Sequence, residues 1–156
     1  PDGTLLWFHA ASVGETNAVL PLMATLGKRR PDLAFLLTTG TVTSAKLADQ
    51  RLGTRSIHHF VPLDTPHYAA RCIAHWQPEL AGFTESEIWP KLIIETERAN
   101  VPIALVNARM SERSYKRWRK SLGVARPLFG RFTIVLAQNK RRADRFSALR
   151  APHVVT

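Results

Sequence analysis

Short apolar runs alternate with longer amphipathic segments along the whole chain, and this alternation constrains the fold more than any other feature. The apolar runs predict strands over residues 5–10, 33–39, 56–62, 79–83, 102–108 and 132–138, with HVVT at 153–156 as a seventh. The segments between them predict helices over residues 15–29, 42–52, 66–76, 89–99, 112–120 and 140–149. This order, with continuously apolar strands, is typical of a buried parallel sheet. We therefore expect one α/β domain, a Rossmann-like parallel sheet with helices on both faces.

The composition is that of a single folded domain. The chain has 156 residues, of which 45% are hydrophobic, and this is enough for a core of ordinary size. No apolar run approaches the roughly 20 residues that span a bilayer. We expect no signal peptide, because the chain opens directly into a strand-like segment. Cys72 is the single cysteine, which excludes a disulfide framework and a cysteine-based zinc site and indicates a reducing, cytosolic setting.

The charge balance is strongly basic. Lys and Arg number 22 against 12 Asp and Glu, a net charge of +10. Most of the excess follows residue 108, in RMSERSYKRWRK and NKRRADRFSALR. A chain this basic is expected to bind polyanions, and composition leaves nucleic acid, anionic lipid and phosphorylated substrates equally open.

Polar side chains follow the end of each predicted strand. These segments are Ser12–Glu15, Thr38–Thr41, Pro62–Thr65, Thr84–Glu87, Asn107–Arg109 and Gln138–Asn139. Because the carboxyl ends of parallel strands share one edge of a sheet, we expect these loops to converge there. Carboxylates, hydroxyls, an amide and a guanidinium are the composition of a polar substrate site.

Each of these residues also has a structural interpretation. Gly14 could supply a tight turn, and Glu15 could be an acid favoured at a helix N-terminus. His9 at a strand end is more often a buried core histidine than a catalyst, and Trp89 before a proline is more often a packing anchor. The two acids Glu85 and Glu87 could belong to a solvated loop.

The usual cofactor and metal motifs are absent from the sequence. It contains no GxxxxGK[ST], and SVGETN does not fit GxGxxG. It contains no HExxH, and the adjacent His58 and His59 would point to opposite faces of a strand. We therefore expect neither a dinucleotide cofactor nor a metal.

Taken in order, the polar segments resemble a known family. WFHAASVGE, TTGT, VPLD, ESEIWP, NARMSERS and AQNKRRADRF are similar to segments of the transferases of 3-deoxy-D-manno-octulosonic acid (Kdo) in lipopolysaccharide synthesis. Lys91 and Met110 are mild departures, where Asn and Leu are expected. The resemblance implies a GT-B glycosyltransferase that moves Kdo from CMP-Kdo to a lipid A precursor. Residues 1–156 would form its N-terminal acceptor-binding domain, and the C-terminal domain that binds CMP-Kdo is expected outside this chain, as is the family's short N-terminal membrane-associated segment.

The resemblance also implies roles for individual residues. Glu15 is the catalytic base of an inverting transfer, since it can take the proton of the attacking sugar hydroxyl. A helix N-terminus would weaken this base, whereas burial beneath the acceptor would strengthen it. The expected acceptor-binding residues are Ser12, Gly14, Thr39, Thr41, Glu85, Glu87, Asn107, Arg109 and Arg113.

The helix predicted at 112–120 carries Tyr115 and Trp118 among Arg and Lys residues. It could be a solvated helix with two half-buried aromatic side chains, or an interfacial helix that contacts anionic lipid. The resemblance places the protein on the cytoplasmic face of the bacterial inner membrane, with a lipid A precursor and that membrane surface as partners.

Two alternatives belong to other classes. The charge would suit a basic α/β module that binds nucleic acid, although acids at the sheet edge would repel it, so we expect no nucleic-acid partner. Half of another GT-B sugar transferase or epimerase would carry the same type of fold, and its donor site would distinguish it.

Overall fold

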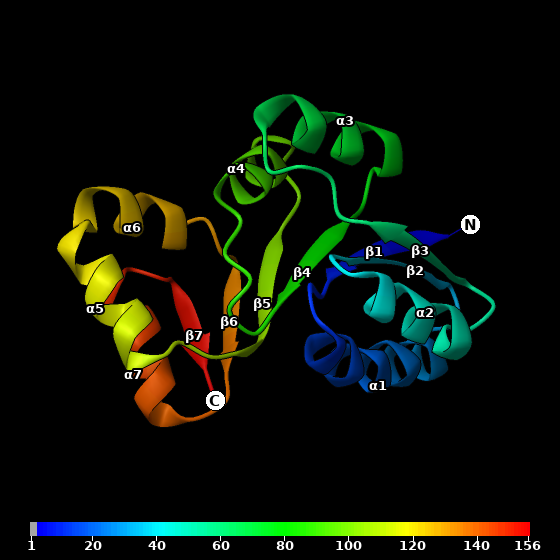
Figure 1. The fold of residues 1–156 in the computed structure, drawn as a ribbon, viewed down its shortest axis with the longest axis horizontal. Helices are drawn as coiled ribbons and strands as arrows, with labels where there is room; N and C mark the ends of the chain where they lie inside the picture. Colours follow the sequence, from blue (N-terminus) through cyan, green and yellow to red (C-terminus); the bar gives the residue numbers. More distant parts are fainter. Residues whose placement is uncertain (1–2) are drawn as a thin grey trace.

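The computed structural model describes residues 3–156 as one seven-stranded sheet in which every pair of neighbouring strands is parallel. The strands are β1 (Thr4–His9), β2 (Leu33–Thr39), β3 (Ser56–Phe60), β4 (Leu80–Thr84), β5 (Ile103–Ala108), β6 (Ile134–Ala137) and β7 (His153–Val155). Their order across the sheet is β3-β2-β1-β4-β5-β6-β7 (Figure 1). The predicted fold class is confirmed.

The helices are α1 (Val13–Arg29), α2 (Val42–Arg51), α3 (Pro66–Trp76), α4 (Pro90–Arg98), α5 (Glu112–Lys120), α6 (Leu122–Phe129) and α7 (Lys140–Ala148). Every predicted element is present, with ends displaced by at most two residues. The sequence did not predict α6, because Gly123 and Pro127 lie inside it and both residues usually interrupt a helix. Burial of Ala125, Leu128 and Phe129 against the sheet outweighs that local preference.

Helices cover both faces of the sheet. On one face, α1 and α2 pack over Phe8, Phe35 and Leu37 through a first apolar cluster. On the other face, side chains of α3, α4, α6 and α7 join Trp7, Phe83 and their neighbours in a second, larger cluster. Alternate residues of β1, such as Trp7 and Phe8, therefore face different layers, as the period of a strand requires.

The strand order changes direction between β1 and β4. The chain moves from β1 to β2 on one side and from β4 to β5 on the other, so the loops after β1 and β4 diverge at the point where open α/β sheets usually form a ligand crevice. The two strands approach closely at Gly82, where an added Cβ would lie 2.5 Å from Phe8 Cδ1. At Gly40 an added Cβ would lie 3.1 Å from the carbonyl oxygen of Ala11, so the loop after β2 also lies against the loop after β1.

Among residues 3–156, none of the helices combines the length and the apolar character needed to cross a bilayer.

Candidate active site

Glu15 is fixed by the start of α1. Ser12 is the N-cap residue, and its Oγ accepts a hydrogen bond from the Glu15 backbone N–H at 3.3 Å. Glu15 Oε2 in turn accepts from the backbone N–H groups of Ala11 at 2.7 Å and Ser12 at 3.3 Å. This reciprocal capping box satisfies donors that a helix otherwise leaves free, and it holds the carboxyl beside the crevice. The structural interpretation of Glu15 is thus correct, and it leaves room for a second role.

The other carboxyl oxygen of Glu15, Oε1, has no hydrogen-bond partner among the described residues. The residue is only 6% exposed, and this burial is the main reason why the pKa of Glu15 lies above its usual value. The charge of Glu87 raises that pKa further, and the bonds from Ala11 and Ser12 oppose the shift. Burial therefore outweighs the effect of the helix terminus, and the result is a carboxylate with one free oxygen and increased basicity.

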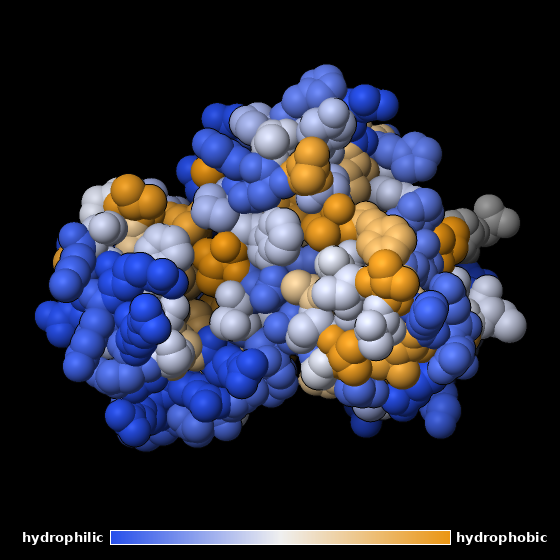
Figure 2. Space-filling view, viewed as in Figure 1, coloured by the Kyte–Doolittle hydropathy of each residue, from blue (hydrophilic) through white to orange (hydrophobic). Residues whose placement is uncertain are grey.

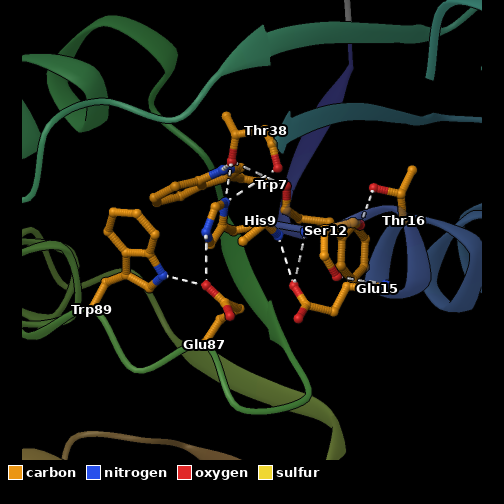
Figure 3. Close-up of polar contacts among 10 residues, drawn as sticks. Trp7, His9, Ser12, Glu15, Thr16, Thr38, Glu87 and Trp89 are labelled. Carbon is orange, nitrogen blue, oxygen red and sulfur yellow. Dashed lines mark hydrogen bonds and ion pairs between the residues drawn. The ribbon is translucent and has the colours of Figure 1, made fainter. Parts of the chain in front are cut away.

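Glu87, in the loop after β4, lies beside two ring nitrogens. Its Oε2 accepts from Trp89 Nε1 at 2.5 Å and lies 3.6 Å from His9 Nε2 (Figure 3). Burial alone would raise the pKa of Glu87, but the contacts with His9 and Trp89 outweigh it, so the pKa lies below its usual value. Glu87 is therefore a weaker base than Glu15.

His9 ends β1 and is fully buried. Its Nδ1 lies 3.2 Å from the Thr38 carbonyl oxygen and 3.0 Å from Thr38 Oγ1. The same Oγ1 accepts a hydrogen bond from Trp7 Nε1 at 2.9 Å. A polar chain thus runs from β2 through β1 to the loop after β4 (Figure 3).

Glu85 and Asn107 form the next part of the edge. Both have positive φ angles, 58° and 51°, which turn the chain sharply at the ends of β4 and β5. Glu85 Oε2 forms an ion pair with Arg109 Nε at 2.7 Å, and Oε1 accepts a hydrogen bond from Asn107 Nδ2 at 3.3 Å. Glu85 is therefore a structural anchor for Arg109, whose side chain is 52% exposed. The two acids of ESE have different surroundings, and neither lies in a simple solvated loop.

The remaining candidates beside β2 have structural partners as well. Thr39 Oγ1 lies 2.9 Å from His58 Nε2, and the Thr41 side chain caps α2 by accepting from the Ser44 backbone N–H at 3.1 Å. Gly14 faces open space, since an added Cβ would have only Ser12 Oγ within 4 Å. The structure places these residues on the predicted edge, and their part in acceptor binding stays a prediction.

Arg113 lies on α5 and is exposed, away from the capping box of Glu15. A cavity of about 130 Å³ separates α5 from the loop after β4, and its polar lining consists of Arg109, Arg117, Ser86 and Ser114. Arg117 has no ion-pair or hydrogen-bond partner among the described residues. Arg109 and Arg117 thus line one cavity, whereas Arg113 lines another with Lys116, Arg117 and Lys120.

The aromatic side chains of α5 point inward. Trp118 packs edge-on against Phe129, with ring centroids 5.3 Å apart, and both Tyr115 and Trp118 pack against the larger core cluster. The Arg119 and Arg145 guanidinium groups each lie 5.8 Å from the centre of the Tyr115 ring. Of the two interpretations of this helix, half-buried aromatics are correct, and insertion of the rings into lipid is not supported.

Charge and apolar surface are separated on the molecule. Figure 2 shows hydrophilic side chains gathered over α5 and α7, and apolar ones over the α1, α2 and β3 part of the same face. Phe60, the last residue of β3, and Val42 and Leu63, which follow β2 and β3, are 57–67% exposed. One flank of the crevice is therefore basic and the other is apolar.

The sequence did not predict that His9 and Trp89 both contact the Glu87 carboxylate. It predicts both as packing residues, and their rings do meet edge-on with centroids 5.2 Å apart. The sequence feature that could have indicated these contacts is a histidine at the end of a buried strand in a chain that carries Glu85 and Glu87 in a later loop.

Among residues 3–156, no three His, Cys, Asp or Glu side chains gather in a way that could hold a metal ion.

The comparisons with known proteins agree with one another. The family model described as 3-deoxy-D-manno-octulosonic-acid transferase (kdotransferase) matches residues 1–156. The "Probable 3-deoxy-D-manno-octulosonic acid transferase, mitochondrial" of Arabidopsis thaliana is 36% identical over 99% of this chain and 35% of its own length. A 3-deoxy-D-manno-octulosonic acid transferase of Rickettsia felis is 38% identical over 94% of this chain and 31% of its own length. The chain thus spans about a third of these curated relatives.

Solved structures support the fold. The S. aureus MnaA–UDP co-structure matches 97% of this chain and 43% of its own with a TM-score of 0.69 at 12% identity. Phytolacca americana UGT2 matches all of this chain and 54% of its own with a TM-score of 0.65 at 9% identity. At such low identity the likeness shows the fold alone, one half of the GT-B architecture. The match over the full 156 residues decides the family: this chain belongs to the 3-deoxy-D-manno-octulosonic acid transferases and corresponds to their N-terminal domain.

Proposed function

We propose that this chain is the acceptor-binding half of an inverting glycosyltransferase, which transfers Kdo from CMP-Kdo to a lipid A precursor. One observation carries the proposal. Glu15 lies at the switch point of the sheet with one carboxyl oxygen free, and burial together with Glu87 raises its pKa. The donor CMP-Kdo would be bound mainly by the C-terminal domain, and the residues on this chain call for no metal or other cofactor in the chemistry below.

In the proposed step, an acceptor hydroxyl donates its hydrogen bond to Glu15 Oε1. Its oxygen attacks the anomeric carbon of Kdo as the bond from that carbon to the CMP phosphate oxygen breaks on the opposite face. The hydroxyl proton passes to Glu15, and CMP leaves with the bonding electrons. One base and no covalent intermediate suffice, and the configuration inverts. Glu87 keeps a negative charge near Glu15 and so favours acceptance of the proton.

The acceptor is expected to lie across the crevice. Its sugar phosphate would bind Arg109 and Arg117 in the small cavity before α5, where a fork of guanidinium donors suits a phosphate. Its acyl chains would lie toward the apolar flank formed by Val42, Phe60 and Leu63. This arrangement leaves the sugar hydroxyl between the two flanks, near Glu15.

The basic face of α5 supports a place for the domain against anionic lipid. Arg113, Lys116, Arg117, Arg119 and Lys120 are all exposed, and an anionic surface attracts each such charge by about 1 kcal/mol. We place the protein on the cytoplasmic face of the bacterial inner membrane on this basis and on the chemistry of the acceptor.

The test is Glu15→Gln in the full-length protein, with Glu79→Gln, at an exposed acid before β4 and outside the proposed site, as the control. Gln can still accept the capping hydrogen bonds of Ala11 and Ser12 but cannot take a proton. We expect kcat for Kdo transfer to fall roughly 10²- to 10⁴-fold in Glu15→Gln. Binding of the acceptor should change little. Near-normal turnover of Glu15→Gln would show that the base lies elsewhere.

A further inference from the structure

We propose that His9 is a positioning residue, which holds Glu87 in place facing Glu15 and so acts on the transfer without touching the substrate. The effect of His9 on catalysis rests on the proposed function, whereas the contacts of His9 do not depend on it. His9 is fully buried, so neither the acceptor nor the donor can reach its ring. Any effect of His9 on the reaction must pass through another side chain.

The orientation of the His9 ring is fixed on its Nδ1 side. The Thr38 carbonyl oxygen, 3.2 Å from Nδ1, can only accept, so Nδ1 carries the hydrogen. The N–H of Trp7 donates to Thr38 Oγ1 and holds that hydroxyl beside the ring. The other ring nitrogen, Nε2, is thereby directed away from β2 and toward the loop after β4.

Nε2 is a buried polar atom with no hydrogen-bond partner among the described residues. Glu87 Oε2 lies 3.6 Å away, which is too long for a hydrogen bond and close enough for an ion pair. The rings of Phe83 and Trp89 stand edge-on to His9, with centroids 6.0 and 5.2 Å away, and keep the ring in place. A proton between Nε2 and Oε2 would satisfy both atoms, whereas an unmatched buried nitrogen is costly.

Glu87 is therefore held from two sides, by His9 of β1 and by the indole N–H of Trp89. Of the titratable groups, His9 contacts Glu87, and the charge of Glu87 acts on Glu15. Thr38, which also contacts His9, is neutral, and so is Trp7, which donates to Thr38 Oγ1. The series Trp7–Thr38–His9–Glu87–Glu15 thus joins β1, β2, the loop after β4 and the start of α1, and its last member is the proposed base.

Two substitutions at position 9 separate this role from simple packing. In His9→Asn the amide nitrogen lies near the original Nδ1, so the bond to Thr38 can remain while the contact with Glu87 is lost. In His9→Gln the longer side chain places an amide N–H near the original Nε2, so the contact with Glu87 can remain. Positioning predicts that His9→Gln retains more activity than His9→Asn, and a purely structural anchor on Thr38 predicts the reverse order.

In the full-length protein we expect kcat of His9→Asn to fall about 10- to 100-fold. We also expect the acidic limb of its pH profile to move to lower pH, because Glu87 is no longer held ionised beside Glu15. Trp89→Phe, which removes the other hydrogen bond without emptying the core, should move the limb the same way and covers the case that a His9 variant does not fold. Equal or better activity of His9→Asn than of His9→Gln, with an unmoved acidic limb, would overturn the proposal.

A second measurement keeps this inference separate from the proposed reaction. Titration of the Glu carboxyl ¹³C resonances in the full-length protein should show that the midpoint of Glu87 rises in His9→Asn and stays near the wild-type value in His9→Gln. This result needs no turnover. If the wild-type protein does not transfer Kdo, the proposed function fails, and the Glu87 midpoint still decides whether His9 positions it.

Discussion

Glu85 and Arg109 join the ends of two neighbouring strands through an ion pair, in which Arg109 Nε lies 2.7 Å from Glu85 Oε2. Asn107 binds the second oxygen of Glu85, and Gln138 Nε2 donates to the Asn107 carbonyl oxygen at 3.2 Å. Glu85 and Asn107 both adopt left-handed backbone conformations, which cost about 1–3 kcal/mol for residues other than glycine. The side-chain contacts across the edge hold this strained corner and aim Arg109 at the cavity before α5.

Asn107 should therefore tolerate glycine better than alanine. Asn107→Ala loses the bond to Glu85 and keeps the strained φ of 51°, so we expect the free energy of unfolding to fall by about 1–2 kcal/mol. Asn107→Gly loses the same bond but relieves the strain and should cost less. Urea unfolding of the two variants side by side measures the difference, and equal losses would mean that the backbone conformation carries no strain.

Arg145 of α7 should matter far more to stability than Arg141, although both contact Glu112. Arg145 is only 11% exposed, and it donates to Glu112 and to the Met110 carbonyl oxygen. Arg141 is 81% exposed and lies 3.5 Å from the same carboxylate. We expect Arg145→Ala to lower the free energy of unfolding by about 1.5–3 kcal/mol, because hydrogen bonds of a buried charge are lost. Arg141→Ala should stay within about 0.5 kcal/mol, as exposed pairs usually do. Similar losses in thermal or urea unfolding would contradict this difference.

The sequence predicted the sheet well because its strands are continuous apolar runs, and it predicted the shared edge because parallel strands all end on one side. The sequence could not predict which side chains contact one another at this edge. SVGE shows a carboxylate at a helix start, but only the fold reveals that one oxygen of Glu15 is used for capping and the other is free. ESE shows two acids, but only the neighbouring strands separate Glu85, bound by Arg109, from Glu87, bound by Trp89. Such differences arise from contacts between residues far apart in the chain, for which a single sequence carries no local signal.

The pH dependence of stability gives a direct test of the state of Glu15. Its pKa in the folded protein is raised above the reference value of 4.5, first by burial and then by Glu87. The folded state thus holds this proton more tightly than the unfolded chain, so its stabilising contribution is complete below about 4.5 and is lost as the pH rises through the folded-state pKa. Glu15→Gln removes this dependence. Relative to the wild type, we therefore expect Glu15→Gln to gain stability as the pH rises above 4.5.

The titration of Glu87 can be distinguished from that of Glu15 in this measurement. Its pKa is lowered, despite burial, by the contacts with His9 and Trp89, so its contribution is present above the unfolded value and is lost only at lower pH. The two carboxyls therefore affect stability on opposite sides of about 4.5. Urea unfolding of the wild type and Glu15→Gln at several pH values gives the result. If the wild type instead becomes more stable relative to Glu15→Gln as the pH rises, the capping hydrogen bonds affect the pKa of Glu15 more than burial does.

The basic face of α5 should bind anionic membranes through charge alone. Its basic side chains are exposed, whereas Tyr115 and Trp118 pack against the protein core and are not free to insert into lipid. We expect the full-length protein to bind vesicles that contain anionic lipid at low salt and to dissociate as salt rises, because screening weakens exposed charges. Changing Lys116, Arg117, Arg119 and Lys120 to Ser should weaken this binding without unfolding the domain. Trp118→Ala is the matched control on the same helix: it should lower stability, through the lost contact with Phe129, and leave vesicle binding by the folded fraction unchanged. Binding to RNA of matched charge density distinguishes a preference for anionic lipid from a preference for nucleic acid. A preference for RNA at equal salt would reject the membrane assignment in favour of nucleic acid.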